Sequence, residues 1–228
     1  MDKPDISIII PVYNEAKHLD KLFSNIEFLR DKCEIIFVDG GSYDGTQDGI
    51  LERGGNVIVA PQKGRANQMN YGAKNSTGDI LWFLHADSVV PAMSFDQIQD
   101  VLDAGYKIGC FPIEFDSSHL FMTIHAWLSN FRVQSRSVAF GDAGIFLTRA
   151  LFEELGGYAD IPLMEDYQLS IDIKKLGLTI GMTKEKIITS QRRYIKNGPL
   201  KTMWKMQVLQ HQFRQGHDIQ KIANSYNE

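Results

Sequence analysis

The sequence ISIIIPVYNE at residues 6–15 is the stretch that decides the fold. Its first seven residues are almost all apolar, which is typical of a strand that a parallel sheet buries on both faces. Tyr13, Asn14 and Glu15 follow directly, so ligand-capable side chains stand where this strand ends. Further short apolar runs, rich in β-branched residues, predict strands at residues 35–38, 57–60 and 80–84.

Helical patterns separate these four strands. Apolar residues recur at helical spacing at residues 19–29, and helices are also expected near residues 46–53 and 65–75. This alternation predicts βαβ units, so we expect an α/β fold with a Rossmann-like, mainly parallel central sheet flanked by helices. The four strands of such a sheet end at one edge, where ligands of open α/β sheets bind.

The pattern changes after residue 105. We expect one long strand at residues 108–115, a helix at 120–136 and a strand at 144–147, which together form a small mixed addition to the same core. Helices at residues 149–155, 167–176 and 200–214 and a strand at 179–188 complete the prediction.

Composition excludes several classes of protein. The chain has 228 residues, of which 43% are hydrophobic and 23% charged, as in ordinary globular domains. Its net charge of −4 argues against nucleic acid as a partner. Cys33 and Cys110 have no metal-binding spacing, so neither a zinc site nor a disulfide framework is expected. No apolar run approaches a membrane span and no signal sequence is seen, which favours a cytoplasmic location.

The sequence DGGSYDGT at residues 39–46 follows the second strand. The carboxylates of Asp39 and Glu15 suit the hydrogen-bonding groups of a base or a ribose. Gly41 allows the backbone to approach a ligand closely, and Ser42 is expected to cap the next helix. A plain turn without a ligand is an equally good interpretation of this stretch alone.

Lys63 precedes the helix expected at residues 65–75, Arg65 begins it and Asn70 lies within it. A helix N-terminus with nearby cations favours a diphosphate. A basic loop that faces solvent is the alternative interpretation of these residues.

The segment His85-Ala86-Asp87 follows the fourth strand and is the strongest candidate for a metal site. Asp87, together with diphosphate oxygens and water, can complete the octahedral coordination of Mg²⁺ or Mn²⁺. A single His such as His85 is more often a hydrogen-bonded structural residue than a ligand.

Glu165 and Asp166 form an adjacent acidic pair before the helix expected at residues 167–176. Acidic residues often only stabilise the first turn of a helix. The functional alternative is that one of them is a general base that removes a proton from an acceptor hydroxyl.

Five motifs in this order resemble the family 2 glycosyltransferases, which are inverting enzymes of the GT-A fold. They are PVYNE from residue 11, VDGGSYDGT from residue 38, LHAD from residue 84, GDAG from residue 141 and MED from residue 164. The resemblance extends from Ile6 to about Arg193. It is strongest to small stand-alone members that carry KGRA, here from residue 63, and a late Arg-Arg-aromatic sequence, here Arg192-Arg193-Tyr194.

The resemblance implies a donor that is a UDP- or GDP-linked sugar, an unknown acceptor, and Mg²⁺ or Mn²⁺ as cofactor. It implies that Tyr13, Glu15 and Asp39 hold the nucleoside, that Asp87 binds the metal and that Asp166 is the catalytic base. Two departures affect nucleotide choice and metal affinity: Gly40 and His85 stand where many members have Asp. The predicted donor-binding set is Pro11, Tyr13, Glu15, Asp39, Gly41, Ser42, Lys63, Arg65, Asn70 and Asp87; the predicted acceptor-side or phosphate set is Glu165, Gly144, Arg192 and Arg193.

We expect one domain over residues 1–228, with a nucleotide-sugar-binding half at 1–105, an acceptor-side half at 106–198 and a C-terminal helix at 199–228. Core packing or a homodimer contact is favoured for that helix over contact with a membrane. Two other functions remain open at this point, a sugar-phosphate nucleotidyltransferase and a non-catalytic nucleotide-sugar-binding protein.

Overall fold

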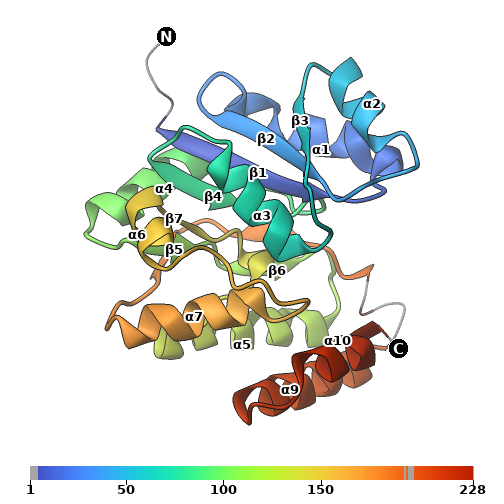
Figure 1. The fold of residues 1–228 in the computed structure, drawn as a ribbon. Helices are drawn as coiled ribbons and strands as arrows, with labels where there is room; N and C mark the ends of the chain where they lie inside the picture. Colours follow the sequence, from blue (N-terminus) through green and yellow to red (C-terminus); the bar gives the residue numbers. More distant parts are fainter. Residues whose placement is uncertain (1–4, 193, 195–197, 228) are drawn as a thin grey trace.

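A seven-stranded sheet forms the centre of the computed structural model, which describes residues 5–192, 194 and 198–227 (Figure 1). The strand order is β3-β2-β1-β4-β7-β5-β8. β1 pairs in parallel with β2 and with β4, and β2 pairs in parallel with β3. The predicted α/β fold with a mainly parallel sheet is therefore confirmed. The strands of this sheet are β1 (Ile6–Val12), β2 (Glu34–Asp39), β3 (Asn56–Val59), β4 (Ile80–Phe83), β5 (Ile108–Cys110), β7 (Phe146–Thr148) and β8 (Gly181–Met182).

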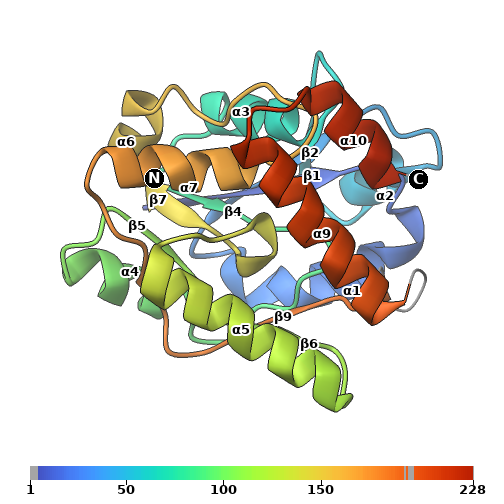
Figure 2. The same cartoon turned by 90° about the horizontal axis from the view of Figure 1, so that it is seen from below.

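β1 is almost wholly buried, as its composition predicts. Ile6, Ile8, Ile9 and Ile10 have no exposed surface. Two helices cover opposite faces of the sheet beside β1, α3 (Arg65–Lys74) in front and α1 (Leu19–Ile26) behind (Figures 1 and 2). A Cβ at Gly72 of α3 would lie 2.5 Å from Ile9 Cγ2, so only glycine allows this close packing.

The predicted single strand at residues 108–115 is wrong. The chain instead forms β5 in the main sheet and β6 (Ile113–Phe115) in a separate two-stranded sheet with β9 (Ile187–Thr189). Between them, the Phe111 N–H donates to the carbonyl of Ala143 at 2.8 Å. Pro112 has no N–H to donate, so it cannot extend β5 as a ladder strand.

The predicted single strand at residues 179–188 is also wrong. This stretch contains two strands, β8 and β9, which a turn at residues 183–186 separates. In this turn the Gln97 side-chain oxygen accepts hydrogen bonds from the N–H groups of Lys184 and Glu185, at 3.0 Å and 2.9 Å. These contacts to a distant helix redirect the chain between the two sheets.

The predicted helices are present, and two were missed. The helix predicted at residues 120–136 is α5 (Leu120–Arg136), with the same bounds. The missed helices are α4 (Ser94–Asp103) and α10 (Ile219–Asn227). The remaining α-helices of the described residues are α2 (Thr46–Glu52), α6 (Arg149–Glu154), α7 (Glu165–Lys175) and α9 (Pro199–Arg214).

The C-terminal stretch is a pair of helices, not the single helix predicted for residues 199–228. α9 ends before Gly216, whose φ of +74° turns the chain into α10. A second apolar cluster joins this pair to the body of the molecule, with Leu209 and Ile222 packed against Leu163 and Met164. The pair crosses the lower side of the molecule (Figures 1 and 2). None of the helices in the described part of the chain is long and apolar enough to cross a bilayer.

Candidate active site

One buried side chain holds the carboxyl ends of β1 and β2 together. Gln68 of α3 donates from its amide nitrogen to the carbonyl oxygens of Val12, at 2.9 Å, and Val38, at 2.7 Å. Gln68 is buried, so these bonds are shielded from water. They fix the spacing of the two strand ends from which the first two polar loops leave.

Asp39 organises the loop that follows β2. Its wholly buried carboxylate accepts hydrogen bonds from the N–H groups of Gly41 and Ser42, both at 2.9 Å, and from the Gln47 side chain at 2.8 Å. The Ser42 hydroxyl also donates to it. Asp39 was predicted to hold a nucleoside, but here its oxygens bind the loop itself. Contact between this carboxylate and a nucleoside stays a prediction.

The prediction that Ser42 caps α2 is wrong. The helix begins at Thr46 after Gly45, which has a φ of +88°, and Asp44 accepts a hydrogen bond from the Thr46 N–H at 3.1 Å. Ser42 Oγ instead accepts a hydrogen bond from the backbone N–H of Asn14 at 2.9 Å. Ser42 therefore joins the loops that follow β1 and β2.

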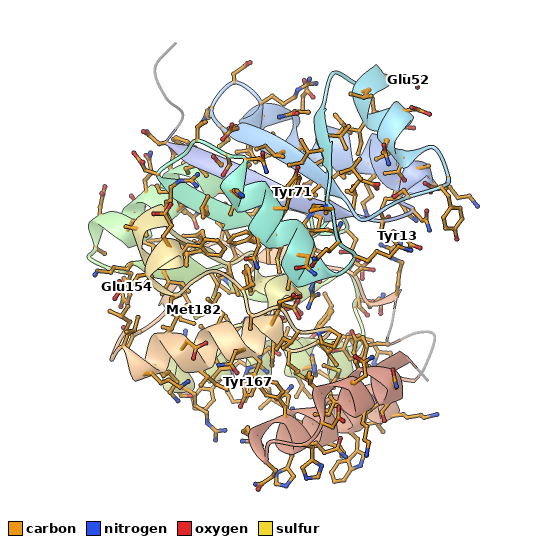
Figure 3. The ribbon with its side chains drawn as sticks, in the orientation of Figure 1. Tyr13, Glu52, Tyr71, Glu154, Tyr167 and Met182 are labelled. Carbon is orange, nitrogen blue, oxygen red and sulfur yellow. The ribbon has the colours of Figure 1, made fainter. Side chains whose placement is uncertain are left out.

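The loop after β1 presents an aromatic ring at the sheet edge. Tyr13 lies on the side where β1 ends (Figure 3), and its half-exposed ring lies 6.4 Å from that of Tyr43 in an edge-on arrangement. Glu15 is anchored by its N–H, which donates to Thr46 Oγ1 at 2.8 Å, and partial burial raises the pKa of its carboxyl. Pro11 lies inside β1, opposite Val38.

α3 begins at the predicted basic segment. Lys63 is exposed just before the helix. Arg65 turns toward α7, where its Nε donates to the Glu165 carboxylate and its Nη2 lies 3.7 Å from Asp166 Oδ2. Although burial opposes it, the charge of Glu165 and then of Asp166 raises the pKa of Arg65 above its ordinary value.

The adjacent acidic residues at the start of α7 face different surroundings. Glu165 is buried against Arg65, and burial raises the pKa of its carboxyl. Asp166 Oδ2 accepts a hydrogen bond from the Gly141 N–H at 2.8 Å, and Oδ1 accepts one from the Tyr167 N–H at 2.7 Å. Only Asp166 lines the large cavity described below. Geometry therefore distinguishes two residues that the sequence left equivalent.

His85 and Asp87, at the end of β4, also have different neighbours. The His85 ring lies 3.5 Å from Arg65 Nη1, and burial together with the Arg65 charge lowers its pKa to about 4, so the ring is neutral at pH 7. Asp87 is partly exposed, and its Oδ2 lies 3.1 Å from Arg192 Nη2. No cluster of three His, Cys, Asp or Glu side chains suited to a metal occurs among the described residues. Asp87 is thus a single carboxylate ligand candidate.

His85 and Asp87 line a cavity of about 400 Å³ together with residues from the second half of the chain. Its polar lining includes Arg65, His85, Asp87 and Asp166, and α5, α9 and α10 contribute further lining residues. Tyr167, at the lower side of α7 in Figure 3, packs its ring against Phe140 and Phe213, which anchors α9 beside the cavity. The other lining residues are Phe115, His125, Ser129, Arg132, Phe140, Asp142, Leu163, Met164, Thr189, Ser190, Arg192, Tyr194, Thr202, Met203, Met206, Gln207, Gln210 and Tyr226.

Of the predicted site residues in the described part of the chain, Arg65, Asp87, Asp166 and Arg192 line this cavity; the others, including Asn70 and Gly144, do not. Asn70 was assigned to the donor, but its side-chain amide donates to the Tyr158 carbonyl at 2.8 Å and accepts from the Tyr158 N–H at 2.9 Å. Gly144 is buried, and a Cβ there would meet Ile187, Trp82 and Phe111. Both positions therefore stabilise the fold. Arg193, also predicted, lies outside the described residues.

Two further charged residues, Asp142 and Arg132, line the cavity and were not predicted from the sequence. Burial raises the pKa of Asp142 to about 6, against the opposing charge of Arg132. Arg132 of α5 lies over the Phe140 ring, with its Cζ 4.3 Å from the ring centre. The motif GDAG from residue 141 already contains Asp142 and could have pointed to it. No local signal marks Arg132, because it reaches the cavity only through the packing of α5.

Comparisons with known proteins identify the family of this chain. The model of the family "Glycosyl transferase family 2" matches residues 7–153. The probable glycosyltransferase YdaM of Bacillus subtilis is 26% identical over 202 residues, covering 78% of this chain and 48% of YdaM. Glycosyltransferase AglE of Haloferax volcanii is 35% identical over 94 residues, covering 37% of this chain and 31% of AglE. This chain thus spans about half or less of the length of these relatives.

Solved structures share the fold. Mannosyltransferase PcManGT of Pyrobaculum calidifontis, in complex with GDP-Man and Mn²⁺, superposes with a TM-score of 0.67 at 22% identity, covering 92% of this chain and 62% of that one. Glucosyl-3-phosphoglycerate synthase of Mycobacterium tuberculosis, with Mn²⁺ and UDP-glucose, gives a TM-score of 0.62 at 19% identity, covering 82% and 70%. With its GT-A sheet and a family match over most of its length, the chain belongs to glycosyl transferase family 2.

Proposed function

We propose that this chain transfers a sugar from a UDP- or GDP-linked donor to an acceptor hydroxyl, with inversion at the anomeric carbon and with Mg²⁺ or Mn²⁺ as cofactor. The observation that carries the proposal is that Asp87 and Asp166, 79 positions apart in the sequence, line one cavity beyond the ends of the parallel strands. The relatives whose structures contain GDP-Man or UDP-glucose with Mn²⁺ support the donor class.

The surroundings of Asp87 fit a divalent cation that takes most of its ligands from the donor. Asp87 offers carboxylate oxygens at the cavity wall and belongs to no metal-suited group of three or more His, Cys, Asp or Glu side chains among the described residues. Mg²⁺ is commonly bound by one or two carboxylates plus substrate phosphates and water. A bound Mg²⁺ or Mn²⁺ supplies positive charge that stabilises the diphosphate as it leaves.

Asp166 is the proposed general base. Two backbone N–H groups hold its carboxylate, and each of its oxygens keeps a further lone pair for an acceptor hydroxyl. Asp166 takes the hydroxyl proton, the hydroxyl oxygen bonds to the anomeric carbon, and the bond from that carbon to the diphosphate breaks with its electron pair on the diphosphate. Attack from the face opposite the leaving group inverts the anomeric configuration.

Three other groups prepare this displacement. Arg65 lies against both acidic residues of α7, so it holds Asp166 near the end of β4. Lys63 is exposed just before α3, and we expect it to bind a phosphate together with the N-terminal end of that helix. Tyr13 presents a ring on which a planar base can stack.

Thermal-shift measurements test the donor and the metal together. We expect a UDP-sugar or a GDP-sugar to raise the melting temperature in the presence of Mn²⁺, because a ligand that binds only the folded state stabilises it by mass action. Asp87→Asn should remove the Mn²⁺-dependent part of this shift, whereas the exposed control Asp31→Asn should keep it. A panel of UDP-, GDP- and dTDP-sugars that leaves the melting temperature unchanged would contradict the proposal. Release of pyrophosphate during turnover would indicate a nucleotidyltransferase instead.

A further inference from the structure

Helix α5 exposes a stripe of large apolar side chains to solvent. Its buried residues Met122, Ala126 and Val133 face the core. The opposite side carries a second apolar stripe at helical spacing, in which the rings of Trp127 and Phe131 stack 5.7 Å apart. The stripe consists of Leu120 (71% exposed), Ile124 (48%), Trp127 (62%), Leu128 (47%) and Phe131 (53%).

Helix α9 repeats this arrangement. Leu200, Trp204 and Val208 are spaced four residues apart, and Trp204 is 73% exposed. Both helices lie on the lower side of the molecule in Figure 1 and toward the viewer in Figure 2. Side chains of both line the cavity, which therefore lies between them. We call the exposed apolar residues of α5 and α9, with the basic residues around them, the lower face.

The lower face has an unusual charge composition. Residues 117–141 and 186–217, which contain α5 and α9, have no Asp or Glu, although the chain as a whole has a net charge of −4. Two of their basic residues, Arg132 and Arg192, line the cavity. The Lys and Arg residues of these two segments are Arg132, Arg136, Lys186, Arg192, Arg193, Lys196, Lys201, Lys205 and Arg214.

We propose that the lower face binds the surface of a bilayer that contains anionic lipids. Exposed apolar patches of this kind mark interaction surfaces, and Trp is favoured where an apolar layer meets water. The basic residues of α5 and α9 complement the negative potential of anionic lipid headgroups. Among the described residues, Lys186 and Arg192 already pair with Glu114 and Asp87, so this charge comes from Arg136, Lys201, Lys205 and Arg214. A second copy of the chain fits less well, because a symmetric contact through this face would bring like charges together. Binding in this way brings the cavity between α5 and α9 close to the lipid surface.

Co-sedimentation with vesicles tests this proposal without any knowledge of the sugar or the acceptor. We expect the protein to sediment with vesicles of phosphatidylcholine and phosphatidylserine but not with phosphatidylcholine alone, and to be released by high salt. The variant Trp127→Ser/Phe131→Ser and the variant Lys201→Glu/Lys205→Glu should each weaken binding at least about tenfold. Matched controls outside both helices, Leu51→Ser/Leu176→Ser and Lys74→Glu/Lys107→Glu, should bind as the wild type does.

Two results would overturn the proposal. The first is that anionic vesicles fail to sediment the protein at low salt, or that they sediment the lower-face variants as well as the wild type. The second is that sedimentation velocity shows a dimer that Trp127→Ser/Phe131→Ser dissociates, because the face is then a contact between copies. Circular dichroism of each variant confirms that it is folded before vesicles are added.

Discussion

The Arg65 guanidinium donates directly to the Glu165 carboxylate, although 100 positions separate the two residues in the sequence. Glu165 is almost wholly buried, whereas 38% of the Arg65 side chain is exposed. This ion pair joins the start of α3, in the parallel half, to the start of α7, in the second half. It therefore sets the position of Asp166 relative to the strand ends.

We expect Arg65→Met to destabilise the protein, because it leaves Glu165 buried without its partner. Breaking a buried ion pair typically costs 3–5 kcal/mol, and the partial exposure of Arg65 reduces the expected loss to about 2–3 kcal/mol. Urea unfolding measures this loss. The double variant Arg65→Met/Glu165→Met should recover most of it, because no unpaired charge remains. A double variant as unstable as Arg65→Met would show that the ion pair is not the cause.

We expect Asp166→Asn to reduce the turnover number by about 10²–10⁴-fold, because general-base catalysis contributes that much. Donor affinity should change little, since Asp166 contacts the acceptor in the proposed reaction. Release of UDP or GDP from the donor, with acceptor or water, measures the rate, and calorimetry measures the affinity. Asp142→Asn is the matched control in the same cavity. Loss of activity in Asp142→Asn with retention in Asp166→Asn would transfer the role of base to Asp142.

Arg192 and the metal compete for Asp87 in the proposed site, since Arg192 Nη2 lies 3.1 Å from Asp87 Oδ2. Ion pairs near the surface contribute at most about 1 kcal/mol, so Arg192→Gln should strengthen Mn²⁺ binding in the absence of donor by no more than about fivefold. Titration of Mn²⁺ by electron paramagnetic resonance measures this affinity. Unchanged or weaker binding in Arg192→Gln would show that the contact does not oppose the metal.

Asp142 predicts a pH dependence of stability. Its pKa in the folded protein is about 6, above the ordinary value of 3.8, so its contribution to stability is fully present below about pH 4 and is lost as the pH rises through 6. The free energy of unfolding of Asp142→Asn, relative to that of the wild type, should therefore rise by on the order of 2 kcal/mol as the pH increases from about 4 to 7. Urea unfolding at both pH values checks this. A difference between the two proteins that is independent of pH would contradict the prediction.

Asn70→Ala separates a structural role from the donor-binding role that the sequence suggested. The variant leaves the buried polar groups of Tyr158 without partners, and we expect a loss of about 1–3 kcal/mol in the free energy of unfolding. The donor-induced thermal shift should persist. Loss of that shift, with unfolding unchanged, would return Asn70 to the donor site.

The sequence determined the parallel half of the fold. Apolar runs such as Ile6 to Val12 can only be buried on both faces of a sheet, and the helical patterns between them require crossovers. The placement of polar residues after β1, β2 and β4 followed from that order alone. Pro112 interrupts residues 108–115 because it has no N–H to donate, but local periodicity did not indicate that the two pieces pair with different strands, β5 with β7 and β6 with β9.

Tertiary structure alone decided which polar residues face the cavity. Glu165 and Asp166 are adjacent in the sequence, yet Glu165 is buried in an ion pair with Arg65, whereas Asp166 lines the cavity. Asp39 and Asn70 looked suitable for a ligand, but their hydrogen-bonding groups bind the protein itself. The sequence shows what a side chain can bind, whereas its partner depends on contacts between residues far apart in the chain, which exist only after folding.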